Sequence, residues 1–135
     1  MQHLPGRSRI VLSGHRTTTL YLLNPTKRKI EKVEVDGCAI TEGLRCDWLI
    51  LANDMTSHEE IYVELKGADF HHALDQLRQT ITKLSTDRRR LRKRCYVVLT
   101  RNPMTGTDVQ QMKVRFLNDF NACFTPVRDR AEVQL

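Results

Sequence analysis

Two carboxylates and a lysine stand where the surrounding sequence is apolar. Asp47 begins the segment Cys46–Ala52, which is otherwise almost continuously apolar, and Glu64 is followed two residues later by Lys66. Carboxylate oxygens suit hard cations such as Mg²⁺, which keep several waters and accept a substrate phosphate as a further ligand. Such a cation lowers the pKa of its bound water and stabilises charge that develops on phosphorus. The three residues therefore indicate metal-assisted hydrolysis of a phosphate ester.

The segment Ile61–Lys66 has the alternation of a strand, and this alternation decides where its charges point. Its odd-numbered residues are apolar and share one face, so Glu64 and Lys66 share the other face with Tyr62. One interpretation is an ion pair on an exposed sheet face. The other is a catalytic pair, in which the carboxylate binds a metal and the ammonium faces the reacting water. Asp47 favours the catalytic pair, because antiparallel neighbours lie about 4.8 Å apart and a suitable register would bring Asp47 to Glu64.

The elements that must position these residues are five strands followed by a helix, a strand, a helix and a final strand. Apolar runs and alternation predict strands over Ile10–Leu12, Thr19–Asn24, Lys32–Ile40, Cys46–Ala52 and Ile61–Lys66. Apolar residues then recur at helical spacing from Asp69 to Leu84, with Asp69 as the N-cap.

A second buried-type strand and a second helix follow the first helix. Cys95–Thr100 predicts the strand, and Thr107 with Gln110 forms a capping-box pattern that opens the helix. The apolar stripe of this helix is Val109, Met112, Phe116, Leu117 and Phe120, and Phe124–Leu135 then supplies an edge strand. The order predicts one domain over residues 1–135 with an α/β (α+β) fold. Its mixed central sheet is flanked by helices, and the first helix crosses over from an antiparallel meander to the Cys95–Thr100 strand.

The basicity of the chain is concentrated in one run. Lys and Arg total 22 against 16 acidic residues, and the run from Lys83 to Arg94 holds seven basic residues and one acidic residue. The rest of the chain is therefore neutral. One interpretation is a nucleic-acid surface formed by Arg88, Arg89, Arg90, Arg92, Lys93 and Arg94. The other is a solvated loop or helix end that favours solubility.

Composition and cysteine spacing exclude several classes. With 40% hydrophobic and 28% charged residues the chain has a globular composition. No apolar run approaches the roughly 18 residues of a membrane span. The four cysteines lack zinc-finger spacing, which favours reduced thiols. Residues 1–9 lack the apolar stretch of a secretory signal, so the expected compartment is the cytoplasm.

Asp47, sixteen intervening residues and Glu64-Leu65-Lys66 resemble the Asp…Glu-x-Lys signature of the PD-(D/E)xK nuclease superfamily, which has the restriction-endonuclease-like fold. The resemblance covers about Val33 to Phe120. It implies that Asp47 and Glu64 bind Mg²⁺ or Mn²⁺, and that Lys66 orients or deprotonates the attacking water or stabilises the transition state.

The resemblance also suggests residues that support the site. Gln76 lies ten residues after Lys66, where a RecB-like branch of the superfamily has a helical Gln followed four residues later by Tyr. Here that later position is Thr80, and a solvated polar flank is the alternative for both Gln76 and Thr80. The family often adds an acidic residue, for which Glu31, Glu34 and Asp36 are candidates, although Asp36 before a glycine also suits a turn.

These observations leave three functional hypotheses. The first is a metal-dependent endonuclease that cuts DNA in preference to RNA and acts as a homodimer away from membranes. The second is a non-catalytic nucleic-acid- or protein-binding subunit of a larger DNA-processing or defence complex. The third is an unrelated globular protein with a surface Glu64–Lys66 pair.

Overall fold

The structure is a computed structural model, and it describes residues 2–4, 8–13, 18–35, 47–53, 58–65, 70–85, 91–99, 106–128 and 130–135. Nine strands and two helices fall within these residues. The strands are β1 (Gln2–Leu4), β2 (Arg9–Ser13), β3 (Thr19–Leu23), β4 (Lys29–Glu34), β5 (Trp48–Asn53), β6 (His58–Leu65), β7 (Lys93–Leu99), β8 (Ala122–Arg128) and β9 (Ala131–Gln134). The helices are α1 (Phe70–Leu84) and α2 (Gly106–Phe120).

The larger sheet has six strands in the order β1-β4-β5-β6-β7-β8. Its strands β4, β5 and β6 pair antiparallel, as the predicted meander requires. Helix α1 then leads to β7, which pairs parallel to β6, and α2 leads to β8, which pairs parallel to β7. The prediction of a mixed sheet with a helical crossover is confirmed.

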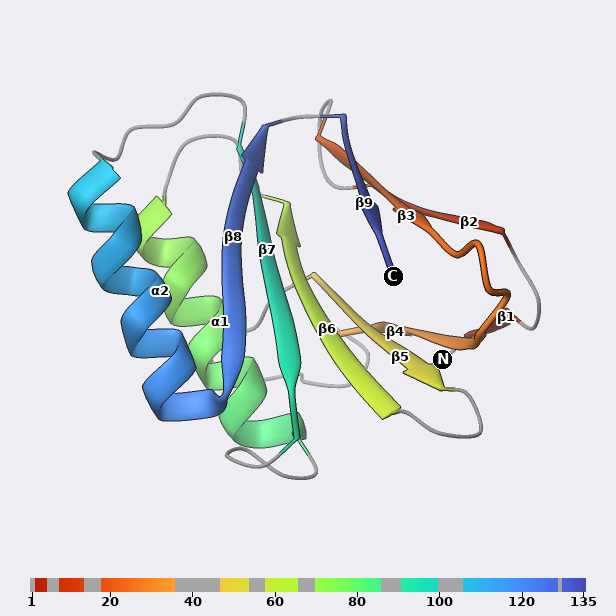
Figure 1. Ribbon diagram of the computed structural model, residues 1–135, viewed down its shortest axis with the longest axis horizontal. Helices are drawn as coiled ribbons and strands as arrows, with labels where there is room; N and C mark the ends of the chain where they lie inside the picture. Colours follow the sequence, from red (N-terminus) through yellow and green to blue (C-terminus); the bar gives the residue numbers. More distant parts are fainter. Residues whose placement is uncertain are drawn as a thin grey trace.

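The larger sheet separates two different layers (Figure 1). Both described helices cover one face, where Leu74, Leu77 and Phe116 pack with strand residues such as Tyr62 and Val97. A smaller sheet of β2, β3 and β9 covers the other face. The prediction that helices flank the sheet is therefore corrected for the described residues, because a second sheet takes the place of a helix on that face.

The second sheet follows from strands that have one apolar face each. In β2 and β3 every second residue is buried, namely Ile10, Leu12, Leu20 and Leu22. Such strands need an apolar layer on one side only, and the odd-numbered residues of β6 supply it. The predicted edge strand within Phe124–Leu135 is two strands: β8 ends the larger sheet, whereas β9 pairs parallel with β3.

The two helices differ in how much of their apolar stripe is buried. In α1 the residues Ala73, Leu74, Leu77 and Ile81 are buried, as predicted. In α2 only Phe116 is buried among the helix residues, and its ring stacks on Phe124 with centroids 5.1 Å apart. Leu117 is 54% exposed, so the apolar stripe predicted for this helix is only partly buried. Helix α2 packs mainly on β8 at the sheet edge, which offers it a narrow contact.

The described parts of the chain contain no helix with the length and apolar character needed to cross a membrane.

Candidate metal site at the carboxyl edge of the sheet

The register of β5 and β6 brings the two predicted metal ligands together. The strands pair antiparallel from Trp48 with Val63 to Asn53 with His58. One residue before this ladder, the N–H of Asp47 donates to the carbonyl oxygen of Val63 at 3.2 Å. Asp47 therefore lies beside the end of β6 that carries Glu64, which is the register that the metal-site prediction requires.

A side-chain hydrogen bond fixes the orientation of the Asp47 carboxylate. Its Oδ2 atom accepts a hydrogen bond from the backbone N–H of Leu65 at 2.8 Å. Leu65 directly follows Glu64, so this bond holds the Asp47 carboxylate against the backbone of β6 one residue after Glu64. A hydrogen bond to an ionised acceptor is shorter and stronger than one between neutral groups, so this bond holds the carboxylate firmly in place.

Glu64 lies on the helix-covered face of the sheet. Its strand neighbours Val63 and Leu65 belong to the core between the two sheets, and Tyr62 belongs to the core beneath the helices. The predicted division of β6 into an apolar face and a face with Tyr62 and Glu64 is confirmed for the described residues. Glu64 is 1% exposed, whereas Asp47 is half-buried.

The donor set fits a cation that needs few protein ligands. Within the described ranges no group of three or more His, Cys, Asp or Glu side chains is arranged to hold a metal ion. Mg²⁺ binds through one or two carboxylates and completes its shell with water and substrate phosphate, so the pair Asp47 and Glu64 is compatible with it. Lys66 and Asp36 lie outside the described residues, and their roles stay predictions.

Helix α1 carries the two residues, Gln76 and Thr80, that are expected to support the site. Gln76 is half-buried in the second turn of α1, and its role at the site stays a prediction. Thr80 is fully buried, and its Oγ1 donates to the backbone carbonyl of Gln76 at 2.7 Å. The alternative that Thr80 lies on a solvated flank is therefore wrong.

A second buried carboxylate on the same face of β6 is already engaged. Glu60 Oε1 accepts hydrogen bonds from the Tyr62 hydroxyl at 2.9 Å and from Ser85 Oγ at 2.7 Å. Burial, reinforced by the Glu60 charge, raises the pKa of Tyr62 far above its ordinary value. The Tyr62 hydroxyl therefore stays protonated and donates away from Glu64.

The basic run divides into structural and surface residues. Lys93 is fully buried, and its ammonium donates to the carbonyl oxygens of Leu91 at 2.6 Å and Phe120 at 2.9 Å. The second contact caps the carboxyl end of α2. Because this ammonium has no access to solvent, the Lys93 side chain does not lie on a phosphate-binding surface. Arg92 is exposed.

Arg94 belongs to an ionic cluster that the sequence did not indicate. Its guanidinium donates to both carboxylate oxygens of Glu59, at 2.7 and 2.6 Å, and to the carbonyl of Gln134 at 2.6 Å. Arg28 also donates to Glu59, at 3.2 Å. The Arg94 side chain therefore links β6 to β9 through hydrogen bonds and is not a free cation on the surface. Arg88, Arg89 and Arg90 lie outside the described residues.

The charges in this cluster shift each other's pKa. Burial acts to raise the pKa of Glu59, but the guanidinium groups of Arg94 and Arg28 outweigh it and hold the pKa below its ordinary value. Burial acts to lower the pKa of Arg94, and the hydrogen bonds to Glu59 and Tyr96 outweigh it, so the net shift is upward. Glu59 and Arg94 are thus both charged at neutral pH.

Comparison with known proteins gives the chain no relatives: no family model, curated protein or solved structure matches it.

Proposed function

We propose that the protein is a metal-dependent endonuclease of the PD-(D/E)xK type, with a restriction-endonuclease-like core, that hydrolyses phosphodiester bonds of DNA. The observation that carries the proposal is the hydrogen bond from the Leu65 N–H to Asp47 Oδ2, at 2.8 Å, beside Glu64. A carboxylate held against the end of a neighbouring strand, one residue after a second acidic residue, is an arrangement that a bound cation would stabilise. The strand order around it, a meander followed by two parallel crossovers, supports the same proposal.

In the proposed reaction the residues of the chain have separate tasks. Asp47 and Glu64 would supply carboxylate oxygens to Mg²⁺ or Mn²⁺, and the Leu65 N–H would keep the Asp47 carboxylate oriented. The bound cation would activate water and stabilise charge on the phosphate. Lys66 would orient or deprotonate the attacking water or stabilise the transition state, as the resemblance to the superfamily implies.

The second candidate function is a non-catalytic subunit that binds nucleic acid or another protein. The burial of Glu64, which is 1% exposed, favours this alternative. A catalytic cation must contact both its carboxylate ligands and the substrate phosphate, and a carboxylate as buried as Glu64 leaves little room for both. A binding subunit has no such requirement.

Cleavage of a labelled DNA panel separates the two candidates. The purified protein is incubated with single-stranded, double-stranded and branched DNA in Mg²⁺ or Mn²⁺, with EDTA as the metal-free control. We expect cutting that EDTA abolishes, that Asp47→Asn and Lys66→Ala reduce by orders of magnitude, and that Asp75→Asn leaves unchanged. Asp75 is an exposed acid on α1, so its variant controls for the loss of one negative charge. Metal-dependent cutting that survives in Lys66→Ala would refute the assignment of the site.

A two-fold homodimer is part of the proposal, because one site cuts one strand in each binding event. Two-fold dimers are the commonest soluble oligomers. Light scattering of the protein with and without DNA tests this point, and a monomer under both conditions would contradict it.

A further inference from the structure

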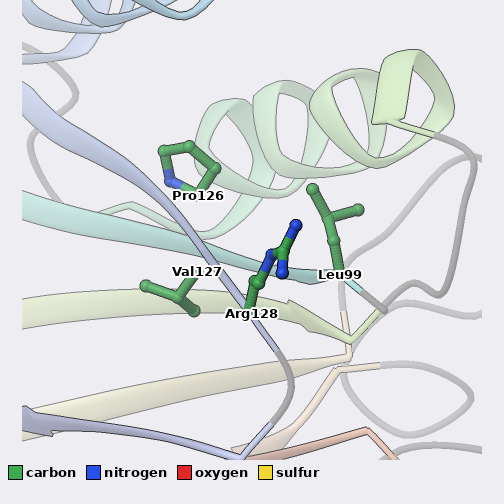
Figure 2. Close-up of a pocket in the computed structure, with 4 residues that line it drawn as sticks. All are labelled: Leu99, Pro126, Val127 and Arg128. Atoms are coloured by element: carbon green, nitrogen blue, oxygen red, sulfur yellow. The ribbon is translucent and has the colours of Figure 1, made fainter. Parts of the chain in front are cut away.

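A small pocket lies where the parallel strands β7 and β8 end (Figure 2). Leu99, Pro126, Val127 and Arg128 line it, and its volume is about 120 Å³. Leu99 and Arg128 are the last residues of their strands and are partners in the register. Figure 2 shows the Arg128 side chain beside Leu99 on the side of the sheet that α1 covers.

This pocket shares an edge of the sheet with the acidic pair. Leu65 pairs with Val98, and Val98 pairs with Val127, so the ends of β6, β7 and β8 are level. The same edge holds the beginnings of α1 and α2 (Figure 1). Glu64 and Arg128 therefore lie two strands and two residues apart, which corresponds to about 12 Å between their Cα atoms.

Arg128 has the chemistry of a phosphate ligand. It is exposed, and its guanidinium makes no hydrogen bond or ion pair with the described part of the chain. A guanidinium presents a planar fork of donors that matches two phosphate oxygens. The apolar side chains of Leu99 and Pro126 lie on the same side of the sheet as Arg128 (Figure 2), where they keep water from part of its surroundings and strengthen an electrostatic contact.

We propose that Arg128 binds a backbone phosphate of the strand that is cut at the Asp47–Glu64 pair. One strand carries a phosphate for every 3.4 Å of helix rise, so about 12 Å corresponds to roughly three or four nucleotides from the scissile bond. The inference rests on the proposed nuclease function and adds a feature of its substrate, namely contact with a phosphate beyond the reacting one. Arg128 is in this role a positioning residue.

Binding in EDTA tests the contact without cleavage. The affinity of the parent, Arg128→Ala and Arg115→Ala for a labelled oligonucleotide is measured by fluorescence anisotropy over a range of salt concentrations. Arg115 is an exposed arginine of α2 and serves as the matched control. We expect Arg128→Ala to bind about tenfold more weakly, as the loss of a charged hydrogen bond implies. The slope of log affinity against log salt should also become shallower by about 0.7 on a single strand or 0.9 on a duplex.

Substrate length supplies a second readout. In Mg²⁺, Arg128→Ala should raise KM and leave kcat unchanged on long oligonucleotides, because the contact is equal in the ground and transition states. On oligonucleotides truncated to two nucleotides on either side of the cut, Arg128→Ala and the parent should behave alike. Arg128→Gln, which keeps most of the side-chain stem, should match Arg128→Ala, and circular dichroism checks that both variants fold.

The outcomes distinguish the inference from the function on which it rests. If the parent binds and cuts DNA while Arg128→Ala equals Arg115→Ala in affinity, salt slope and KM, the phosphate contact is refuted and the nuclease stands. If the parent binds DNA but cuts nothing in Mg²⁺ or Mn²⁺, the nuclease is refuted, and so is the placement of Arg128 relative to a scissile bond. If the parent neither binds nor cuts any nucleic acid, both proposals are overturned.

Discussion

Replacing Asp47 by Asn and by Ala separates the structural role of its carboxylate from its proposed role as a metal ligand. The carboxylate accepts the hydrogen bond from the Leu65 N–H at 2.8 Å. An Asn side chain has an amide oxygen that can accept the same hydrogen bond but has no charge to offer a cation. An Ala side chain can do neither.

The expected magnitudes follow from these two contacts. Without metal, Asp47→Ala leaves the Leu65 N–H without this acceptor and should lower the free energy of unfolding by about 1.5–3 kcal/mol. Asp47→Asn should lower it by less than about 1 kcal/mol, because a neutral acceptor replaces a charged one. With Mg²⁺ at ten times its Kd, the parent should gain about 1.4 kcal/mol through linkage, and neither variant should gain as much.

Urea denaturation followed by circular dichroism, in EDTA and again in Mg²⁺, measures the free energy of unfolding of the parent and of both variants. Asp75→Asn is the control, and its stabilisation by Mg²⁺ should equal that of the parent. If Asp47→Asn keeps the full stabilisation by Mg²⁺, Asp47 is not a metal ligand. If Asp47→Ala is as stable as Asp47→Asn in EDTA, the hydrogen bond from Leu65 does not stabilise the fold.

Three further predictions concern the core, the ionic cluster and the basic run. Phe116→Ala should lower the free energy of unfolding by about 3–5 kcal/mol because Phe116 is fully buried, whereas Leu117→Ala should lower it by about 1 kcal/mol or less because Leu117 is half exposed. Urea denaturation measures both losses, and equal losses would contradict the packing of α2. The pKa of Glu59 is depressed in the folded protein, so its charge stabilises the fold above the unfolded pKa of about 4.3, and this contribution is lost as pH falls through the lower folded pKa. Glu59→Gln should therefore make thermal stability depend less on pH in acid, and an unchanged pH dependence below about pH 5 would refute this. Lys93→Ala should lower the free energy of unfolding by about 2–4 kcal/mol, because Lys93 is buried and bonded to the end of α2. Arg92→Ala, at an exposed position, should keep this free energy and flatten the salt slope of the proposed DNA binding by about 0.9, and the reverse pattern would contradict the structural role of Lys93.

The elements that the sequence predicted well are those with a strong local pattern. Helix α1 has four buried apolar residues at helical spacing, β5 and β7 have apolar runs typical of buried strands, and β6 has the alternation of a strand. The same patterns placed Asp47 and Glu64 on neighbouring strands. Their placement side by side on these strands depends on the pairing of Trp48 with Val63, and no local sequence pattern encodes that register.

The features that the sequence did not predict depend on distant parts of the chain. Strand β9 pairs with β3, so the smaller sheet forms only when the carboxyl-terminal segment returns to the amino-terminal one. Lys93 belongs to a basic run in the sequence, but its burial depends on the end of α2, where its ammonium contacts the Phe120 carbonyl. Leu117 fits the helical stripe, but the narrow contact at the sheet edge leaves it exposed.

The two ends of the larger sheet use their charged residues differently. At the amino ends of β6 and β7, Glu59, Arg94 and Lys93 are engaged with one another or with backbone carbonyls, so they hold the strands and the carboxyl-terminal segment in place. At the carboxyl ends, Glu64 lies beside Asp47, and Arg128 borders a pocket. Ligands of open α/β sheets bind outside the carboxyl ends of the strands, where loops and helix beginnings gather. Substitutions at the amino ends should therefore change stability, and substitutions at the carboxyl ends should change binding and catalysis with smaller effects on the fold.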